Sequence, residues 1–129
     1  MDKLKILLVE DDADDVQLLQ EALEENKVDC ELKVIMEGDK VMPYLNEAGQ
    51  LPDIIVIDFN LPKIHGKELL VSIRSSKAFS TIPLVVLTTS ASPYDRQFAQ
   101  ENGADTFITK PSTIQGFSAA VETIVSLVR

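Results

Sequence analysis

The sequence has little cysteine, few basic residues and no long apolar run. Its single cysteine, Cys30, cannot form an internal disulfide, which fits a reducing compartment. Twelve Lys and Arg residues against 21 Asp and Glu residues give a net charge of −9. Such a balance opposes nucleic-acid binding, which depends on positive charge facing phosphates. The apolar run near the N-terminus covers only residues 6–9, too short for a signal peptide or a membrane span. We therefore expect a cytoplasmic protein that binds neither nucleic acid nor membrane.

The length and composition are those of one globular domain. The chain has 129 residues, of which 45% are hydrophobic and 26% are charged. A chain of this length buries roughly two thirds of its unfolded surface and needs no disulfide or structural metal to fold. The sequence contains no repeat, low-complexity tract or linker. We expect a single domain over residues 1–129, without an output domain.

Apolar runs alternate with helical patterns five times along the chain. Residues 54–57 and 82–88 are typical of strands buried on both faces of a parallel sheet, as are residues 5–9. Residues 31–35 alternate more and are expected nearer a sheet edge, and residues 106–109 form the last strand. Apolar spacings of three and four predict helices at 12–26, 38–45, 66–75, 95–102 and 114–128, although Pro43 leaves the start of the second open. Right-handed crossovers then predict a doubly wound α/β domain with helices on both faces of the sheet.

Polar side chains follow four of these strands at the point where each strand ends. They are Glu10-Asp11-Asp12 after the first, Asp58 after the third, Thr88-Thr89-Ser90 after the fourth and Lys110-Pro111 after the fifth. The carboxyl ends of parallel strands meet at one edge of a sheet, where ligands bind. The buried strand that ends on Asp58 makes this aspartate the centre of the predicted site.

If the first and third strands are neighbours, Glu10, Asp11 and Asp58 converge. Two carboxylates about 5 Å apart repel by roughly 3 kcal/mol at an effective dielectric constant of about 20, which favours a bound cation. All-oxygen ligands with few protein groups suit Mg²⁺. Lys110 supplies a second positive charge, and Thr88 supplies a hydroxyl donor. A nucleophile surrounded by positive charge is the equipment of phosphoryl transfer.

Simpler interpretations apply to several neighbouring residues. Asp12 is expected to cap a helix, and Asp53 to be a turn residue before a strand. His65 is interpreted as a polar loop residue rather than a phosphodonor or ligand, and Cys30 as a small packing residue. Lys110 alone would be a solvated loop residue, and only the shared strand edge favours a functional role.

In their order and spacing, the segments ILLVEDD, VIDFNLPKIHG, PLVVLTTS and ADTFITKP resemble the receiver domain of two-component response regulators. The resemblance covers essentially the whole chain. It implies a flavodoxin-like (CheY-like) five-stranded parallel sheet in the order 2-1-3-4-5. It also implies a phosphoacceptor protein that takes a phosphoryl group from a sensor histidine kinase onto Asp58. Such a protein is not a turnover enzyme in the usual sense, because it catalyses its own phosphorylation and slow autodephosphorylation.

The resemblance also assigns roles to the other residues at the strand ends. Asp11 becomes the direct Mg²⁺ ligand, Glu10 its partner through water, and the Asn60 backbone carbonyl a further ligand. Thr88 becomes the switch hydroxyl and Phe107 the switch aromatic residue. Lys110 becomes the phosphoryl-binding lysine, and its peptide bond to Pro111 is expected to be cis. Two departures from the family pattern are Glu10 in place of the commoner aspartate, and Thr89, whose bulk is expected to narrow access to the pocket.

The LTTS run, the PDIIVIDFNLPK loop and the longer segment after the second strand resemble the small receivers associated with bacterial phytochrome kinases. This resemblance implies a bacteriophytochrome as the kinase partner. Phosphorylation of Asp58 is expected to shift the population between an inactive and an active conformation by recruiting Thr88 and Lys110. The output surface would be the fourth helix, fifth strand and fifth helix, through which the protein dimerises or docks a partner.

Three other functions compete with this one. A phosphatase of the haloacid dehalogenase type needs a second aspartate two residues after the nucleophile, where this chain has Asn60. A flavodoxin-like FMN carrier needs a Ser-, Thr- and Gly-rich loop after the first strand, where this chain has three acids. A receiver-like docking module that does not use phosphorylation is the alternative left open, and Mg²⁺ binding with a response to beryllofluoride distinguishes it.

Overall fold

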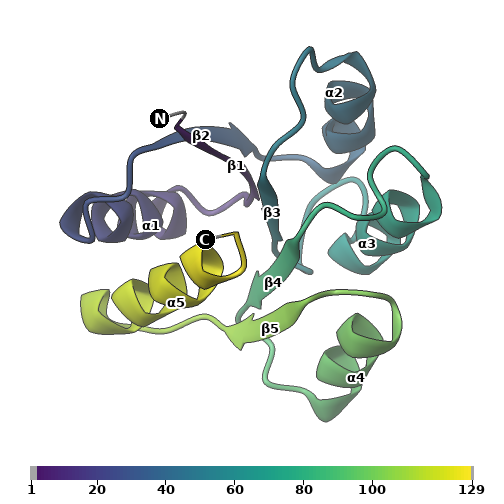
Figure 1. Cartoon of the computed structure of the whole chain (residues 1–129). Helices are drawn as coiled ribbons and strands as arrows, with labels where there is room; N and C mark the ends of the chain where they lie inside the picture. The colour runs from purple at the N-terminus through teal and green to yellow at the C-terminus, as the bar shows by residue number, and fades with distance from the viewer. Residues whose placement is uncertain (1–2, 129) are drawn as a thin grey trace.

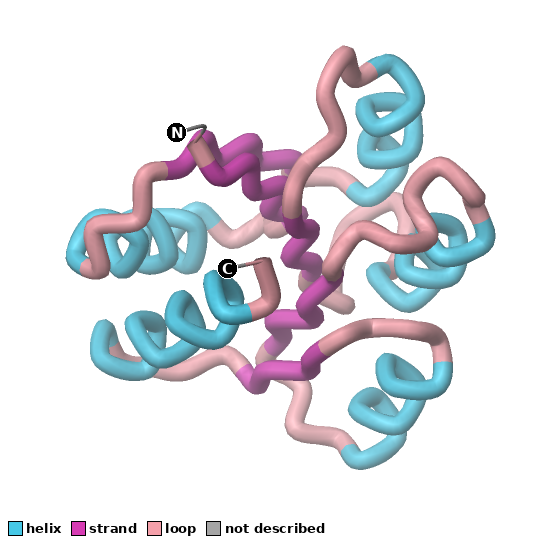
Figure 2. The backbone as a smooth tube through the Cα atoms, viewed as in Figure 1, coloured by secondary structure: helices cyan, strands magenta, loops and turns pink. Residues whose placement is uncertain are grey.

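The computed structural model describes residues 3–128 as a central parallel sheet covered by helices on both faces (Figure 1). Strands and helices alternate along the chain as the sequence pattern predicts, and Figure 2 shows the alternation on the backbone trace. The elements are β1 (Leu4–Val9), α1 (Ala13–Glu25), β2 (Cys30–Ile35), the 3₁₀ turn η1 (Gly38–Lys40), α2 (Val41–Glu47), β3 (Ile54–Ile57), α3 (Gly66–Ser75), β4 (Leu84–Thr88), α4 (Pro93–Glu101), β5 (Thr106–Thr109) and α5 (Ile114–Ser126).

All neighbouring strands pair in parallel, in the order β2-β1-β3-β4-β5. This confirms the doubly wound 2-1-3-4-5 sheet. The register pairs Val9 with Ile57, so the residues that follow, Glu10 and Asp58, leave adjacent strands at the same level. At the other side of the site the Lys110 amide donates to the Thr88 carbonyl at 2.7 Å, which couples the ends of β5 and β4. The sheet thus presents its polar strand ends along one edge.

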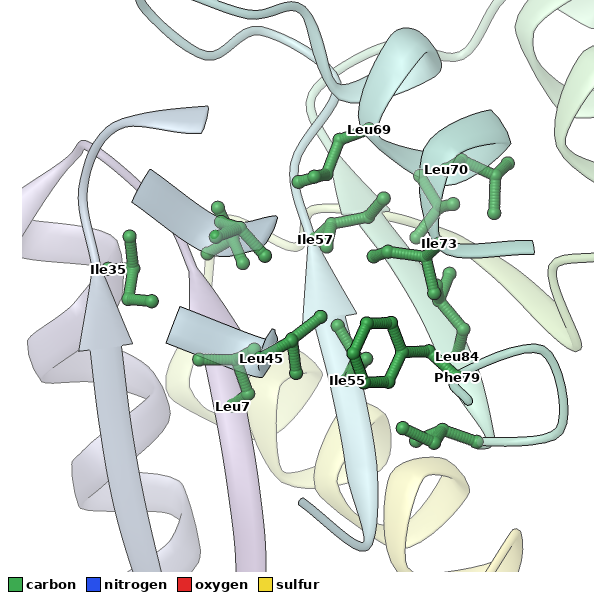
Figure 3. Close-up of a cluster of buried hydrophobic side chains, with 14 of the residues drawn as sticks. Leu7, Ile35, Leu45, Ile55, Ile57, Leu69, Leu70, Ile73, Phe79 and Leu84 are labelled. Carbon is green, nitrogen blue, oxygen red and sulfur yellow. The ribbon is translucent and has the colours of Figure 1, made fainter. Parts of the chain in front are cut away.

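The two faces of the sheet carry two separate apolar cores. Alternate strand residues point to opposite faces, so Leu7, Ile55 and Ile57 pack against α2, α3 and α4, while Ile6, Leu8 and Val56 pack against α1 and α5. Figure 1 shows α1 and α5 together on one side of the sheet, and Figure 3 shows Leu69, Leu70 and Ile73 of α3 over β3. Every residue of β3 and β4 is buried, as expected for central strands.

Several element boundaries differ from the prediction. β4 begins at Leu84 instead of residue 82, although the Pro83 carbonyl already accepts from the Ile55 amide at 2.9 Å. α4 begins at Pro93, where proline suits a first turn that has unpaired amides, and Ser92 caps it. Pro43 lies in the first turn of α2, where its missing N–H costs no helical hydrogen bond. α5 ends at Ser126 instead of residue 128.

Within residues 3–128, no helix combines the length and apolar character that crossing a bilayer requires.

Candidate functional site

Three carboxylates meet where β1 and β3 end. One side-chain oxygen from each of Glu10, Asp11 and Asp58 lies within 4.8 Å of the other two. Glu10 and Asp58 are buried, at 2% and 4% exposure, and Asp11 is exposed. The convergence follows from the pairing of β1 with β3, because each acid comes within two residues of a paired strand end. The predicted acidic cluster is therefore present.

Lys110 reaches this cluster from the end of β5. Its Nζ lies 2.6 Å from Glu10 Oε1, 2.9 Å from Asp58 Oδ2 and 2.8 Å from Asp15 Oδ2. The lysine side chain is only 5% exposed, so water screens these ion pairs weakly. One ammonium group thus faces three carboxylates, and its contact with Asp58 is the arrangement that the sequence predicts.

Thr88 and Asn60 complete the surroundings of the Asp58 carboxylate. Thr88 is fully buried at the end of β4, and its side chain hydrogen-bonds to Asp58. The Asn60 amide donates to Asp58 Oδ1 at 3.2 Å. Asp58 Oδ2 is the oxygen that Lys110 contacts, so both oxygens of the buried carboxylate have donors.

The charges in the site perturb one another. Burial, together with repulsion from Asp58, raises the pKa of Glu10 to about 7 in spite of the opposing contact with Lys110. Burial alone would also raise the pKa of Asp58, but hydrogen bonds from Lys110, Thr88 and the Asn60 amide hold it below its ordinary value. Burial would lower the pKa of Lys110, yet its three carboxylate partners raise it far above its ordinary value. At neutral pH the Asp58 carboxylate is therefore charged and the lysine is protonated.

The donor set fits a divalent hard cation. Three carboxylates from two strand ends offer only oxygen ligands, and few protein ligands with room for water are what Mg²⁺ prefers. Burial and the nearby Asp58 carboxylate both raise the pKa of Glu10, so its charged form is disfavoured even with Lys110 in place. A cation between Glu10, Asp11 and Asp58 would favour that charged form.

A second polar network holds the loop between β4 and α4. Ser90 Oγ donates to Asp95 Oδ2 at 2.6 Å, and Asp95 Oδ1 lies 2.5 Å from Lys67 Nζ in the first turn of α3. The Ser90 amide in turn lies 3.5 Å from Thr88 Oγ1. Lys67 therefore connects α3 to the loop that follows Thr88. The sequence contains no short-range signal for this link, because its members come from three elements.

Phe107, the expected switch aromatic residue, is half-buried on β5. Its ring centroid lies 6.0 Å from that of the buried Phe59. The guanidinium of Arg96, a residue of α4, lies 4.8 Å from the Phe107 ring centroid. The ring thus packs between the loop after Asp58 and the helix after Thr88. Its movement on activation stays a prediction.

The structure supports the simpler interpretations of several residues. Asp12 caps α1 by accepting from the Asp14 and Asp15 amides, and His65 Nδ1 accepts from the Lys67 amide at 3.1 Å at the start of α3. Asp53 Oδ2 accepts from the Lys5 amide at 2.8 Å. These three side chains organise backbone outside the acidic cluster.

One expectation is wrong and one residue was missed. The peptide bond between Lys110 and Pro111 is trans, not cis. The trans form is favoured by about 0.5–1 kcal/mol at such bonds, and with it Lys110 already reaches the cluster. The missed residue is Asp15, an acid in the first turn of α1 that the sequence pattern did not assign to the site. Its position three residues after the Asp12 cap, next to the acidic strand end, was the available signal. Thr89 is exposed, and its effect on pocket access stays a prediction.

Comparison with known proteins agrees with this geometry. The family model described as the response regulator receiver domain matches residues 6–122. The response regulator Rcp1 of Synechocystis sp. is 35% identical over 126 residues, which cover 94% of this chain and 86% of Rcp1. The crystal structure of the phosphorylated cyanobacterial phytochrome response regulator RcpA superposes with a TM-score of 0.89 at 34% identity, covering 99% of this chain and 98% of RcpA. The Mn²⁺-bound form of Rcp1 superposes with a TM-score of 0.85 at 35% identity, covering 95% and 91%.

A parallel 2-1-3-4-5 sheet with acids and a lysine at one edge defines the class of phosphoacceptor signalling domains. The match over most of the chain is more specific, and the protein belongs to the family of response regulator receiver domains of two-component systems.

Proposed function

We propose that Asp58 is the phosphoacceptor of this receiver domain. The observation that carries the proposal is the contact of 2.9 Å between Asp58 Oδ2 and Lys110 Nζ inside a cluster with Glu10 and Asp11. An Asp58 oxygen forms a bond to phosphorus while the bond between phosphorus and the imidazole nitrogen of the donor breaks, and the released imidazole takes up a proton. The lowered pKa of Asp58 keeps the attacking carboxylate charged at neutral pH.

The same proposal assigns Glu10, Asp11 and Asp58, with the Asn60 backbone carbonyl, to a Mg²⁺ site. The all-oxygen donor set supports it, as does the solved Mn²⁺-bound form of the relative Rcp1. When bound, the ion neutralises charge on the phosphoryl oxygens. Lys110 supplies a second positive charge at Asp58 Oδ2, and Thr88 supplies a neutral donor.

Signalling follows from a change in population between two conformations. We assign Thr88 and Phe107 to the switch, with Lys110 binding the phosphoryl group. Moving the ratio of conformations from 1:99 to 99:1 takes about 5.5 kcal/mol. Hydrogen bonds to charged groups contribute roughly 1.5–3 kcal/mol each, so two or three new bonds to the phosphoryl oxygens are sufficient.

The proposed phosphodonor is a sensor histidine kinase of the bacteriophytochrome type. Its support is the similarity to RcpA, a cyanobacterial phytochrome response regulator, and to Rcp1. Under this proposal the reaction takes place in the cytoplasm. The proposed output surface is α4, β5 and α5, through which two copies dimerise. A cleft of about 220 Å³ at α4 and β5, lined by residues that include Arg96, Gln100 and Phe107, lies on that surface.

Beryllofluoride, which imitates a phosphoryl group on aspartate, separates this function from a docking module that does not use phosphorylation. With Mg²⁺ and beryllofluoride, we expect amide chemical-shift changes at Thr88, Phe107 and Lys110, and none of them in Asp58→Asn. Unchanged spectra in the wild-type protein would support the docking module instead. Size-exclusion chromatography of the same samples tests dimerisation, which requires a shift to a larger species when beryllofluoride is added.

A further inference from the structure

The roles proposed above leave out one of the three partners of the Lys110 ammonium. Asp15 Oδ2 lies 2.8 Å from Lys110 Nζ, a contact that joins α1 to the end of β5 across 95 residues of sequence. We propose that Asp15 is a positioning residue for phosphoryl transfer, which anchors Lys110 so that one of its N–H groups stays directed at Asp58. The inference rests on the proposed role of Asp58.

The number of donors on the ammonium group supports this role. A lysine ammonium carries three N–H donors. Glu10, Asp15 and Asp58 each place an oxygen between 2.6 and 2.9 Å from Nζ, so the three donors have three acceptors. With two donors held by Glu10 and Asp15, the third points toward Asp58. Anchoring of this kind reduces the conformational freedom that the lysine would otherwise lose in the transition state.

Of the two anchors, Asp15 is the one that lies outside the proposed metal site. The carboxylates close enough to share an ion within residues 3–128 are Glu10, Asp11 and Asp58. A cation held there would compete with Lys110 for Glu10, whereas Asp15 would keep its contact with Lys110. Asp15 would therefore be the anchor that still holds the lysine when the metal is bound, as phosphoryl transfer requires.

Local structure fixes where the Asp15 side chain begins. The Asp12 carboxylate accepts from the Asp14 amide at 2.9 Å and from the Asp15 amide at 3.3 Å, which holds the first turn of α1 in place. The Asp15 side chain is 22% exposed and its lysine partner 5% exposed, so the pair is shielded more than a surface ion pair. A carboxylate in a first helical turn also interacts favourably with the helix dipole, an effect that a test must separate from the contact with Lys110.

Asp14 provides the matched control for that separation. It lies in the same first turn, carries the same charge and is exposed. Within residues 3–128, the carboxylates paired with Lys110 are those of Glu10, Asp15 and Asp58, and Asp14 is not among them. Asp14→Ala and Asp15→Ala change the net charge and the helix-dipole interaction alike. Of these two variants, only Asp15→Ala removes a carboxylate that contacts Lys110.

The experiment measures phosphorylation by acetyl phosphate at saturating Mg²⁺ over a range of donor concentrations, with the Mg²⁺ dissociation constant measured separately. We expect Asp15→Ala to lower the saturating rate about tenfold relative to Asp14→Ala, with the half-saturating donor concentration and the Mg²⁺ affinity of the two variants alike. Asp15→Glu should restore most of the rate. If Asp15→Ala does not fold, Asp15→Asn takes its place, with a loss of about threefold because the amide oxygen still accepts.

A second measurement reports on the lysine itself. In ¹H–¹⁵N spectra of side-chain ammonium groups, we expect slow hydrogen exchange for Lys110 in the wild-type protein and in Asp14→Ala, and fast exchange in Asp15→Ala. Equal saturating rates for the two alanine variants, or a faster Asp15→Ala, would overturn the positioning role while leaving Asp58 phosphorylated. Absence of phosphorylation in the wild-type protein would instead refute the role of Asp58, and the exchange measurement would still decide whether Asp15 anchors the lysine.

Discussion

Gly66 lies directly against the backbone of Asp58, and no space for a Cβ remains between them. A Cβ built on Gly66 would overlap the Asp58 carbonyl oxygen and lie 2.5 Å from the Cα of Phe59. The Gly66 amide also donates to the Phe59 carbonyl at 2.8 Å. The first residue of α3 is thereby held at the end of β3, and the loop of residues 59–65 closes beside the carboxylate.

The close contact between Gly66 and the Asp58 backbone predicts that Gly66→Ala lowers the stability of the fold. Because backbone atoms cannot move aside as a side chain does, we expect a loss of about 1–3 kcal/mol in the free energy of unfolding. Gly49→Ala is the matched control, since a Cβ at Gly49 meets nothing within 4 Å. Urea denaturation followed by circular dichroism measures both. Equal stability of the two variants would show that the Asp58 backbone adjusts freely.

Arg74 should matter for stability and not for the site. Its Nη1 donates to the Ile82 carbonyl at 2.8 Å and its Nε to the Gly103 carbonyl at 2.9 Å, and the side chain is 15% exposed. Lysine cannot reproduce this planar set of donors. We expect Arg74→Lys to lose about 1–3 kcal/mol of stability through carbonyls left without donors. Its Mg²⁺ affinity should equal that of the wild-type protein. A weakened affinity would show that Arg74 also supports the acidic cluster.

The contact between Lys67 and Asp95 predicts that folding stability depends on pH through the Asp95 carboxyl group. Lys67 and then Ser90 lower the pKa of Asp95 below its ordinary value. A lowered pKa in the folded state means that Asp95 stabilises the fold above its unfolded pKa, about 3.9, and that this contribution is lost as the pH falls through the folded pKa. Lys67→Met should raise the pKa of Asp95 toward the ordinary value in a carboxyl ¹³C titration. Lys77→Met, which removes an exposed charge elsewhere, should leave it where it is.

Mg²⁺ binding should depend on Asp11 and not on its neighbour. We expect Asp11→Asn to weaken Mg²⁺ binding at least about tenfold, since a carboxylate near the ion is replaced by a neutral amide. Asp12→Asn is the control, because asparagine caps a helix as well as aspartate does and Asp12 lies outside the cluster. Isothermal titration calorimetry measures both. Comparable losses in the two variants would indicate a diffuse electrostatic effect instead of a site.

The fold and the acidic cluster were predictable because each depends on one strong pattern. Apolar runs without alternation indicate buried parallel strands, and a parallel sheet puts every strand's carboxyl end at the same edge. Glu10, Asp58 and Lys110 follow strand ends directly, so topology alone brings them together. Their convergence needs no knowledge of side-chain conformation.

The contacts that the sequence did not predict depend on where the charged ends of long side chains lie in the folded domain. The ammonium of Lys110 reaches Asp15 on α1, and that of Lys67 reaches Asp95 on α4. Neither pair has a fixed spacing in the sequence, because each joins elements that come together only in the packed domain. The start of α4 at Pro93 was missed for a different reason, since the Ser92 cap and the proline after it are local signals that the apolar pattern alone does not contain.

The central claim is that Asp58 accepts the phosphoryl group, and intact-protein mass spectrometry tests it most directly. The protein is incubated with Mg²⁺ and acetyl phosphate, in parallel with Asp58→Asn. We predict that the wild-type protein gains the mass of one phosphoryl group and that the variant gains none. A wild-type protein that gains no mass, or a variant that gains as much as the wild-type protein, would contradict the account.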